Sequence, residues 1–256
     1  MLSLFHSRAP EEPTGVEPVP TIFPTIEGAD IAAVFTGKRV AGDFYDSIRV
    51  SPERVLFGLL DVAGRREDNR PILTAAQKIF RESGAELFAR TDLNESEAMT
   101  ELSIRLNRGL IDAEAGVHSC PAFIGCYHEQ FGTLCYTNAG HTPGLLRDVG
   151  GTVELPSTGL PLGLFSHATL DAPTVGLEKG SALLLVSRGV LECDGHNGKD
   201  AEEFGLQRVK DLFQSTTGTA QELCTSIMNA LAEFSAHKPI CDDRTALALV
   251  RPAASS

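Results

Sequence analysis

Asp61 is the acidic residue whose setting points most directly to chemistry. It follows an apolar run over residues 55–60, which is typical of a buried strand, and it precedes small residues and Gly64. A carboxylate where a strand leaves the core is costly unless a cation meets it, and a divalent metal is the common partner. The other interpretation is a turn aspartate that caps the following helix. A second acidic pair, Asp43 and Asp46, flanks two aromatic residues earlier in the chain.

The elements that would position these acids come as groups of strands and pairs of helices. Apolar runs and alternating patterns predict strands over residues 31–35, 44–50, 54–60, 122–128, 132–137, 144–147, 152–155, 181–186 and 245–250. Apolar residues at helical spacing predict helices over residues 71–89, 94–110, 206–213 and 219–234. Elements grouped in this way indicate an α+β fold with antiparallel sheets. So many strands indicate more than one sheet, with the helix pairs covering the outer faces.

The composition indicates a protein with a large core and no attraction to polyanions. The chain has 256 residues, 42% of them hydrophobic, and a net charge of −12. This acidity argues against nucleic acid or an anionic membrane as the main partner. No run is long enough for a spanning helix, and the apolar part of residues 1–8 is too short for a secretory signal. The six cysteines lack zinc-like spacing. Three of them lie in apolar runs and predict buried reduced thiols, so we expect a cytoplasmic protein.

One domain is predicted between two loosely packed ends. Residues 9–24 hold five of the 14 prolines, mixed with Glu and Thr, and such a segment cannot bury a core. We therefore expect residues 1–27 to form a mobile arm and residues 28–251 to form the domain. Residues 252–256 are expected to be a frayed tail.

Six short motifs together carry a family resemblance. They are Ala41–Asp46, Asp61–Gly64, Thr137–Pro143, Pro161–Gly163, Ser187–Glu192 and Asp242–Thr245. Over residues 28–251 the chain resembles the SpoIIE/RsbU-type branch of the metal-dependent protein phosphatases (PPM family), relatives of protein phosphatase 2C. The resemblance implies a four-layer αββα sandwich with two Mn²⁺ or Mg²⁺ ions at one end. It also implies hydrolysis of phosphoserine or phosphothreonine on a protein, commonly an anti-sigma-factor antagonist in bacterial partner-switching signalling.

The resemblance also implies which residues would hold the metals. Asp61 would bridge both ions, and the backbone carbonyl of Val62 would help to bind one of them. Asp242 would bind the second ion, and Asp43 would hold waters at the metals. Asp43, Asp61 and Asp242 are thus the predicted catalytic set. Two metals that share a water supply both a nucleophile and a clamp for a phosphate ester.

Four other residues of the motifs are expected to act less directly. For Asp46 and Asp243, roles in turns or hydrogen bonds are favoured over direct metal binding. The segment from Asn138 to His141 is interpreted as a structural turn near the site, with a catalytic role for His141 as the minor alternative.

The chain departs from the family pattern where the second metal should bind. The family has a Thr-Asp-Gly motif there, and this chain has Ser187-Arg188-Gly189. Arginine keeps its proton and offers no lone pair to a metal. At an effective dielectric of about 20, its repulsion from a divalent ion amounts to roughly several kcal/mol. The loop after Asp61 differs as well, because the family's Gly-His-Gly is replaced by Gly64-Arg65-Arg66. We therefore expect one metal site, with the second in doubt.

Three interpretations of Arg188 follow. In the first, the chain is a working phosphatase with one metal, or one in which Arg188 and Arg65 bind the phosphate. In the second, it is an inactive pseudophosphatase that serves as a protein-binding module, with Arg188 paired to Asp61 or Asp242. In the third, Arg188 is a solvated residue at the end of a strand. We expect its guanidinium to lie within hydrogen-bonding reach of Asp61 or Asp242, and its loss to cost roughly 1–3 kcal/mol of metal-free stability.

Overall fold

In the computed structural model the chain forms two antiparallel sheets packed face to face. The structure describes residues 20–37, 42–62, 66–113, 119–167, 170–195, 202–236 and 242–253. One sheet has the order β1 (Asp30–Thr36), β10 (Arg244–Val250), β9 (Ala182–Val186), β6 (Gly144–Asp148) and β7 (Gly151–Leu155). The other has the order β2 (Asp43–Ser51), β3 (Arg54–Asp61), β4 (Ala122–His128), β5 (Thr133–Ala139) and β8 (Thr174–Gly176).

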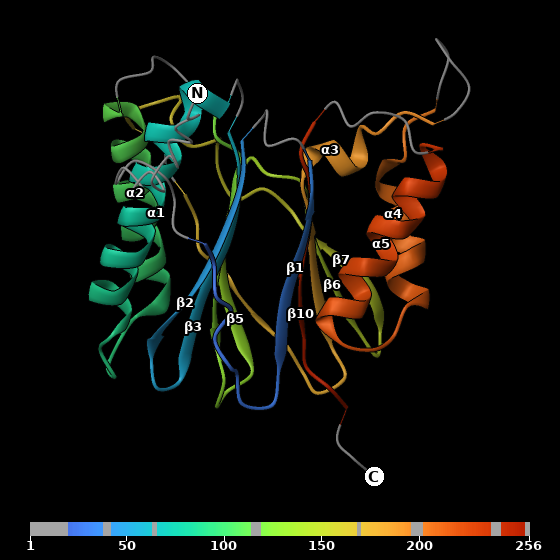
Figure 1. The fold of residues 1–256 in the computed structure, drawn as a ribbon. Coiled ribbons are helices and arrows are strands. Elements are labelled where there is room, and N and C mark those ends of the chain that lie inside the picture. The colour runs from blue at the N-terminus through green and yellow to red at the C-terminus, as the bar shows by residue number, and fades with distance from the viewer. Residues whose placement is uncertain are drawn as a thin grey trace, which may run out of the picture.

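Two helix pairs cover the outer faces of the sheets. Helices α1 (Arg66–Phe88) and α2 (Glu95–Asp112) lie on the β2–β8 sheet, and α4 (Gly205–Ser215) and α5 (Ala220–Phe234) lie on the β1–β7 sheet (Figure 1). A one-turn helix, α3 (Arg188–Leu191), lies at the upper end of the sandwich in this view. The predicted four-layer αββα sandwich is confirmed.

Strand β3 was predicted from a continuous apolar run, and its position between two layers explains that pattern. Every residue of β3 is buried, because the strand has a helix layer on one side and the second sheet on the other. Leu56 and Leu60 belong to the core under α1 and α2. Phe57 and Leu59, on the opposite face, belong to the core between the sheets. Both faces of β3 are therefore buried along its whole length, up to its last residue, Asp61.

Helices α2 and α5 begin at side-chain caps, whereas α3 and α4 have no side-chain capping bond. The Asn94 side chain accepts a hydrogen bond from the Glu97 amide at the start of α2, and Thr219 and Glu222 form a reciprocal capping box at α5. Helix α1, however, begins at Arg66 and includes Pro71, where its start was predicted. Proline removes only one backbone hydrogen bond so near a helix end, so the helix continues through it. Strand β8 and helix α3 were not predicted, because each has four residues or fewer.

The described part of the predicted arm packs on the domain. Residues 1–19 lie outside the described residues, as do residues 254–256 of the predicted tail. The Thr21 hydroxyl donates a hydrogen bond to the Tyr45 carbonyl at 2.8 Å, and the Phe23 ring stacks on Tyr45 with 6.0 Å between centroids. Ile26 is buried. Packing therefore starts before residue 28, the predicted domain boundary.

Two further sequence expectations concern membranes and cysteines. None of the described helices has the length and apolar character needed to cross a membrane. The five cysteines within the described residues are buried free thiols, while Cys241 lies outside them.

Candidate functional site

A small cavity at one end of the sandwich collects most of the predicted acids. It is lined by Asp43, Asp61, Arg188, Gly189, Asp242 and Asp243. Asp43 and Asp61 face each other across the β2–β3 pair, at the start of one strand and the end of the other. Asp242 and Asp243 directly precede β10, and Arg188 begins α3. The cavity is thus built from the ends of strands in both sheets.

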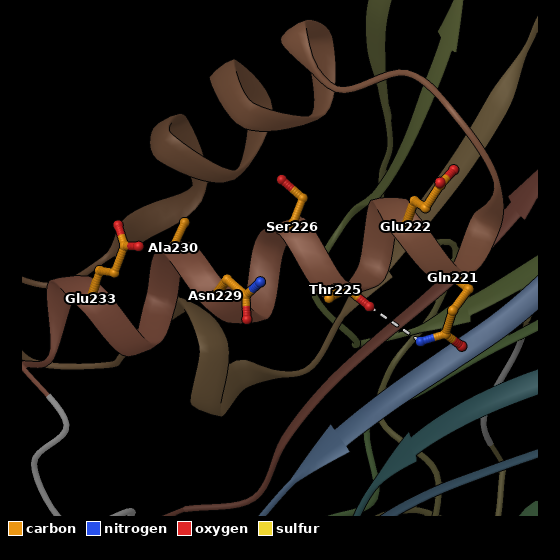
Figure 2. Close-up of a pocket in the computed structure, with 7 residues that line it drawn as sticks. All are labelled: Gln221, Glu222, Thr225, Ser226, Asn229, Ala230 and Glu233. Carbon is orange, nitrogen blue, oxygen red and sulfur yellow. Dashed lines mark hydrogen bonds between the residues drawn. The ribbon is translucent and has the colours of Figure 1, made fainter.

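A second hollow lies on the outer face of α5, over residues 221–233 (Figure 2). Its lining side chains are short or polar and come from that one helix. The hydrogen bond drawn there joins Gln221 Nε2 to the Thr225 hydroxyl at 3.2 Å, one turn apart. This face has the character of a solvated helix surface, so the cavity with the aspartates is the candidate site.

Two glycines allow the backbone to close tightly around the cavity. A Cβ on Gly42 would lie 2.3 Å from the Val62 carbonyl oxygen, and one on Gly189 would lie 2.2 Å from the Asp243 carbonyl oxygen. The Val62 amide donates to the Gly42 carbonyl at 3.1 Å. Any side chain at Gly42 or Gly189 would push these segments apart, so glycine is required at both positions.

Asp61 occupies the cavity wall with its side chain almost fully buried. Its amide donates to the Pro121 carbonyl at 2.8 Å, which ties the end of β3 to the start of β4. Burial raises the pKa of the Asp61 carboxyl, the Arg188 cation opposes this rise, and the Asp242 and Glu192 carboxylates add to it. Asp61 is therefore an acid whose charge is costly until a cation engages it.

Asp43 is held by the last strand of the other sheet. The Thr245 hydroxyl donates to Asp43 Oδ2 at 2.6 Å. Burial raises the pKa of Asp43 to about 7, although the hydroxyls of Ser187 and Thr245 oppose the rise; the charges of Asp61 and Asp243 add to it. Asp43 can therefore exchange a proton near neutral pH.

The raised pKa of Asp43 predicts a pH-dependent stability. Its pKa is about 7 in the folded protein against an ordinary value of 3.8, so folding favours the protonated form. This contribution to the free energy of unfolding is complete at low pH and is lost as the pH rises toward 7. In EDTA, wild type should lose more stability than Asp43→Asn between about pH 5.5 and about pH 8, as measured by urea unfolding. An identical pH dependence for the two proteins would contradict this expectation.

Arg188 pairs with one of the two acids expected, but more loosely than expected. Its Nε lies 3.6 Å from Asp61 Oδ2 and 3.9 Å from Glu192 Oε2, and its side chain is 55% exposed. The partner Asp61 was predicted correctly. The predicted hydrogen bond is not formed, because 3.6 Å is an ion-pair distance. For so exposed a pair, the predicted stability contribution of 1–3 kcal/mol is too high, and less than about 1 kcal/mol is appropriate.

Asp46 lies apart from the cavity and acts in the packing of α1. This buried carboxylate accepts hydrogen bonds from Arg81 Nε at 2.7 Å and Arg81 Nη2 at 2.9 Å. It also accepts from Gln77 Nε2 at 3.2 Å, from the Ser47 amide at 3.0 Å and from the Thr21 hydroxyl at 3.0 Å. These bonds join β2 to α1 and to the segment before β1.

The turn from Asn138 to His141 is buried and supports the strand before Arg188. Asn138 Oδ1 accepts from the His141 amide at 2.8 Å, and the hydroxyl of Thr142 donates to the Val186 carbonyl. Burial lowers the pKa of His141 to about 4, so its ring is neutral at physiological pH. Neither Asn138 nor His141 lines the cavity.

The remaining predicted residues divide between the cavity and the undescribed loop. Asp243 lines the cavity, and its Oδ1 lies 2.3 Å from where a Cβ on Gly37 would be. Arg65 lies outside the described residues. Sequence reasoning missed Ser187, Thr245 and Glu192, which act on Asp43 and Asp61. The signal available was their position inside the motifs, beside the acids and Arg188.

The cavity offers few side-chain groups arranged to bind a divalent ion. Within the described residues, no group of three or more His, Cys, Asp and Glu side chains is arranged to hold a metal ion. The Val62 carbonyl accepts a hydrogen bond from Asn69 Nδ2 at 3.1 Å, and Arg188 stands beside Asp61. Asp61 and Asp242 still offer carboxylate oxygens in one cavity. Mg²⁺ commonly binds to one or two carboxylates and keeps several waters.

Comparison with known proteins identifies relatives over most of the chain. Residues 51–252 match the family model for stage II sporulation protein E (SpoIIE). The phosphoserine phosphatase RsbU of Bacillus subtilis is 26% identical over 237 residues, which is 90% of this chain and 66% of RsbU. The chain thus spans slightly less than two thirds of that relative.

Solved structures share the fold. The structure of the RsbU and RsbW domains of a Mycobacterium tuberculosis protein matches with a TM-score of 0.74 and 22% identity, over 95% of this chain and 64% of that one. The structure of RsbX in complex with magnesium matches with a TM-score of 0.57 and 17% identity, over 86% of this chain and 94% of that one.

Proposed function

This chain belongs to the SpoIIE family, and we propose that it is a metal-dependent protein phosphatase that hydrolyses phosphoserine or phosphothreonine with one bound divalent ion. The observation that carries the proposal is the cavity in which Asp43, Asp61 and Asp242 meet beside the cation of Arg188. Four acids in one cavity would be unfavourable in a fold that used them only for packing. The name of RsbU, a phosphoserine phosphatase, supports the same chemistry.

The residues of the cavity would share the work as follows. Asp61 and Asp242 would hold the ion. A bound Mg²⁺ or Mn²⁺ supplies charge neutralisation for the phosphoryl group and lowers the pKa of water. Asp43, held in place by the Thr245 hydroxyl, would hold the attacking water through its carboxylate.

The proposed substrate is a phosphoprotein such as an antagonist of an anti-sigma factor. The support is the family membership and the pairing of RsbU and RsbW domains in the similar Mycobacterium tuberculosis structure. We propose that this reaction takes place in the cytoplasm, as part of partner-switching signalling. Neither nucleic acid nor a membrane surface is needed as a partner in this proposal.

Metal titration tests the proposal directly. Calorimetry should show one Mn²⁺ or Mg²⁺ per chain, because Arg188 stands where the second ion would need a ligand. Asp61→Asn should abolish this binding, whereas Asp92→Asn, at an exposed residue of a surface pair, should leave it unchanged. Two ions per chain at modest Mn²⁺ concentration would refute the single-site proposal. Mn²⁺-dependent release of phosphate from a phosphoserine peptide should accompany the binding.

The second candidate function is a pseudophosphatase that binds phosphoproteins without hydrolysing them. The ion pair between Arg188 and Asp61 favours it, since this pair engages the acid that a metal would need. Wild-type protein that binds the metal but releases no phosphate from any phosphoserine peptide would support this candidate.

A further inference from the structure

Arg188 is the only cationic side chain among the described residues that line the cavity. Resting on the proposed phosphatase function, we propose that Arg188 binds the phosphoryl group of the substrate. It would do so at the position where the resemblance places a metal-binding aspartate. The chain would thus replace the charge of one metal ion with that of a guanidinium.

The contacts of Arg188 differ from those of the arginines that serve packing. Arg81 donates two hydrogen bonds to Asp46, at 2.7 and 2.9 Å. Arg54 Nε donates to Glu95 at 2.6 Å. Arg188 approaches its two acids only to 3.6 and 3.9 Å, and in both pairs the nearest nitrogen is Nε. More than half of the side chain is exposed. The guanidinium is therefore attracted to the cavity without being locked there.

The backbone that carries Arg188 is fixed, in contrast to its side chain. The Ser187 amide donates to the Thr245 carbonyl at 2.9 Å, and the Thr245 amide donates to Ser187 Oγ at 3.0 Å. On the other side, Gly189 packs so closely against the Asp243 carbonyl that no Cβ would fit. Arg188 is thus anchored to the start of β10, with a flexible cation that reaches over the cavity.

The charge balance explains when Arg188 would turn to a phosphate. Four aspartates line the cavity, and among its described lining residues Arg188 is the one cation, so a phosphoryl dianion would be repelled. When Asp61 is engaged by a divalent ion, Arg188 loses the attraction of its nearest acid. The planar guanidinium can then donate two parallel hydrogen bonds to two phosphoryl oxygens, a geometry that suits arginine. Phosphate binding should therefore need both the ion and Arg188.

Calorimetric titration with inorganic phosphate in saturating Mg²⁺ tests this role. In Arg188→Gln, phosphate affinity should fall about tenfold or more. Mg²⁺ affinity should be unchanged or tighter, because a cation near the ion has been removed. Arg188→Lys, which keeps the charge and loses the planar fork, should lie between Arg188→Gln and wild type. The control Arg90→Gln, at a side chain that is 68% exposed and pairs with Asp92, should change neither affinity.

The outcomes separate the possible roles of Arg188. Weaker phosphate binding with retained Mg²⁺ binding supports the proposal. A parallel loss of both affinities would indicate a structural role and overturn it. Unchanged phosphate affinity in Arg188→Gln, or no phosphate binding by wild type, would overturn it as well. Urea unfolding in EDTA, run on each variant, verifies that the compared proteins are folded.

The same measurements distinguish this proposal from the phosphatase proposal. Wild type that hydrolyses a phosphoserine peptide, while Arg188→Gln keeps full phosphate affinity, would overturn the role of Arg188 alone. Wild type that binds phosphate through Arg188 but never hydrolyses a peptide would overturn the phosphatase function and leave Arg188 as the phosphate-binding residue.

Discussion

Replacing Arg188 with aspartate is expected to raise Mn²⁺-dependent hydrolysis of p-nitrophenyl phosphate by about tenfold or more. The change removes a cation that lies 3.6 Å from Asp61 and places a carboxylate in the cavity with Asp61 and Asp242. A second ion would then have a ligand, and it would take over the phosphate contact proposed for Arg188. The variant should also fold, because an acidic residue suits the first position of α3 better than a basic one.

The measurement is kcat/KM at several Mn²⁺ concentrations, together with a calorimetric count of bound ions. Arg188→Asn serves as the control, since it removes the cation without adding a negative ligand, and it should gain less than Arg188→Asp. If wild type is already fully active and the kcat/KM of Arg188→Asp is no higher, Arg188 does not impair the activity of the cavity.

Asp46→Ala is expected to lower the free energy of unfolding by about 2–4 kcal/mol. The substitution removes the buried acceptor of five hydrogen bonds, two of them from Arg81. Gln77 and the Ser47 amide would also lose this acceptor at a buried position. Arg81 is partly exposed and can regain water, so the expected cost lies at the lower end of the range for broken buried pairs. Urea unfolding of the two proteins measures the difference.

Asp92→Ala is the matched control for this change. Asp92 also pairs with an arginine, Arg90, but at 3.3 Å and with 78% of its side chain exposed. Its loss should leave stability almost unchanged, because an exposed ion pair contributes little. If Asp46→Ala cost no more than Asp92→Ala, Asp46 would not hold α1 on the sheet as described.

The fold could be predicted from the sequence where patterns were long. Strand β3 was visible as a continuous apolar run because the two layers that bury it demand apolar residues on both faces. Strand β8 was invisible because it is three residues at a sheet edge, where pairing with β5 rather than side-chain pattern defines it. The start of α1 was placed five residues too late, since Pro71 is a common first-turn residue and here lies inside the helix.

The sequence motifs pointed to the four aspartates of the cavity but not to the distances between its side chains. The motifs named Asp43, Asp61, Asp242 and Asp243, and the structure brings all four to one cavity. The long distance between Arg188 and Asp61 depends on how the one-turn helix α3 leaves the end of β9. No local sequence pattern encodes this geometry. The five hydrogen bonds of Asp46 likewise come from residues far apart in the chain. Sequence could say only that Asp46 would accept hydrogen bonds rather than bind metal.

The central place of β10 has a consequence for how the protein is synthesised. This strand lies between β1 and β9, and the Thr245 hydroxyl donates a hydrogen bond to Asp43 across 202 positions of sequence. During translation, β1 cannot pair with β10 until about two hundred more residues have been synthesised. Contacts of such long sequence range are slow to form. Until then one sheet is open and its edges can pair wrongly with other chains. A chain that has not yet reached β10 therefore carries an aggregation risk and lacks the assembled cavity.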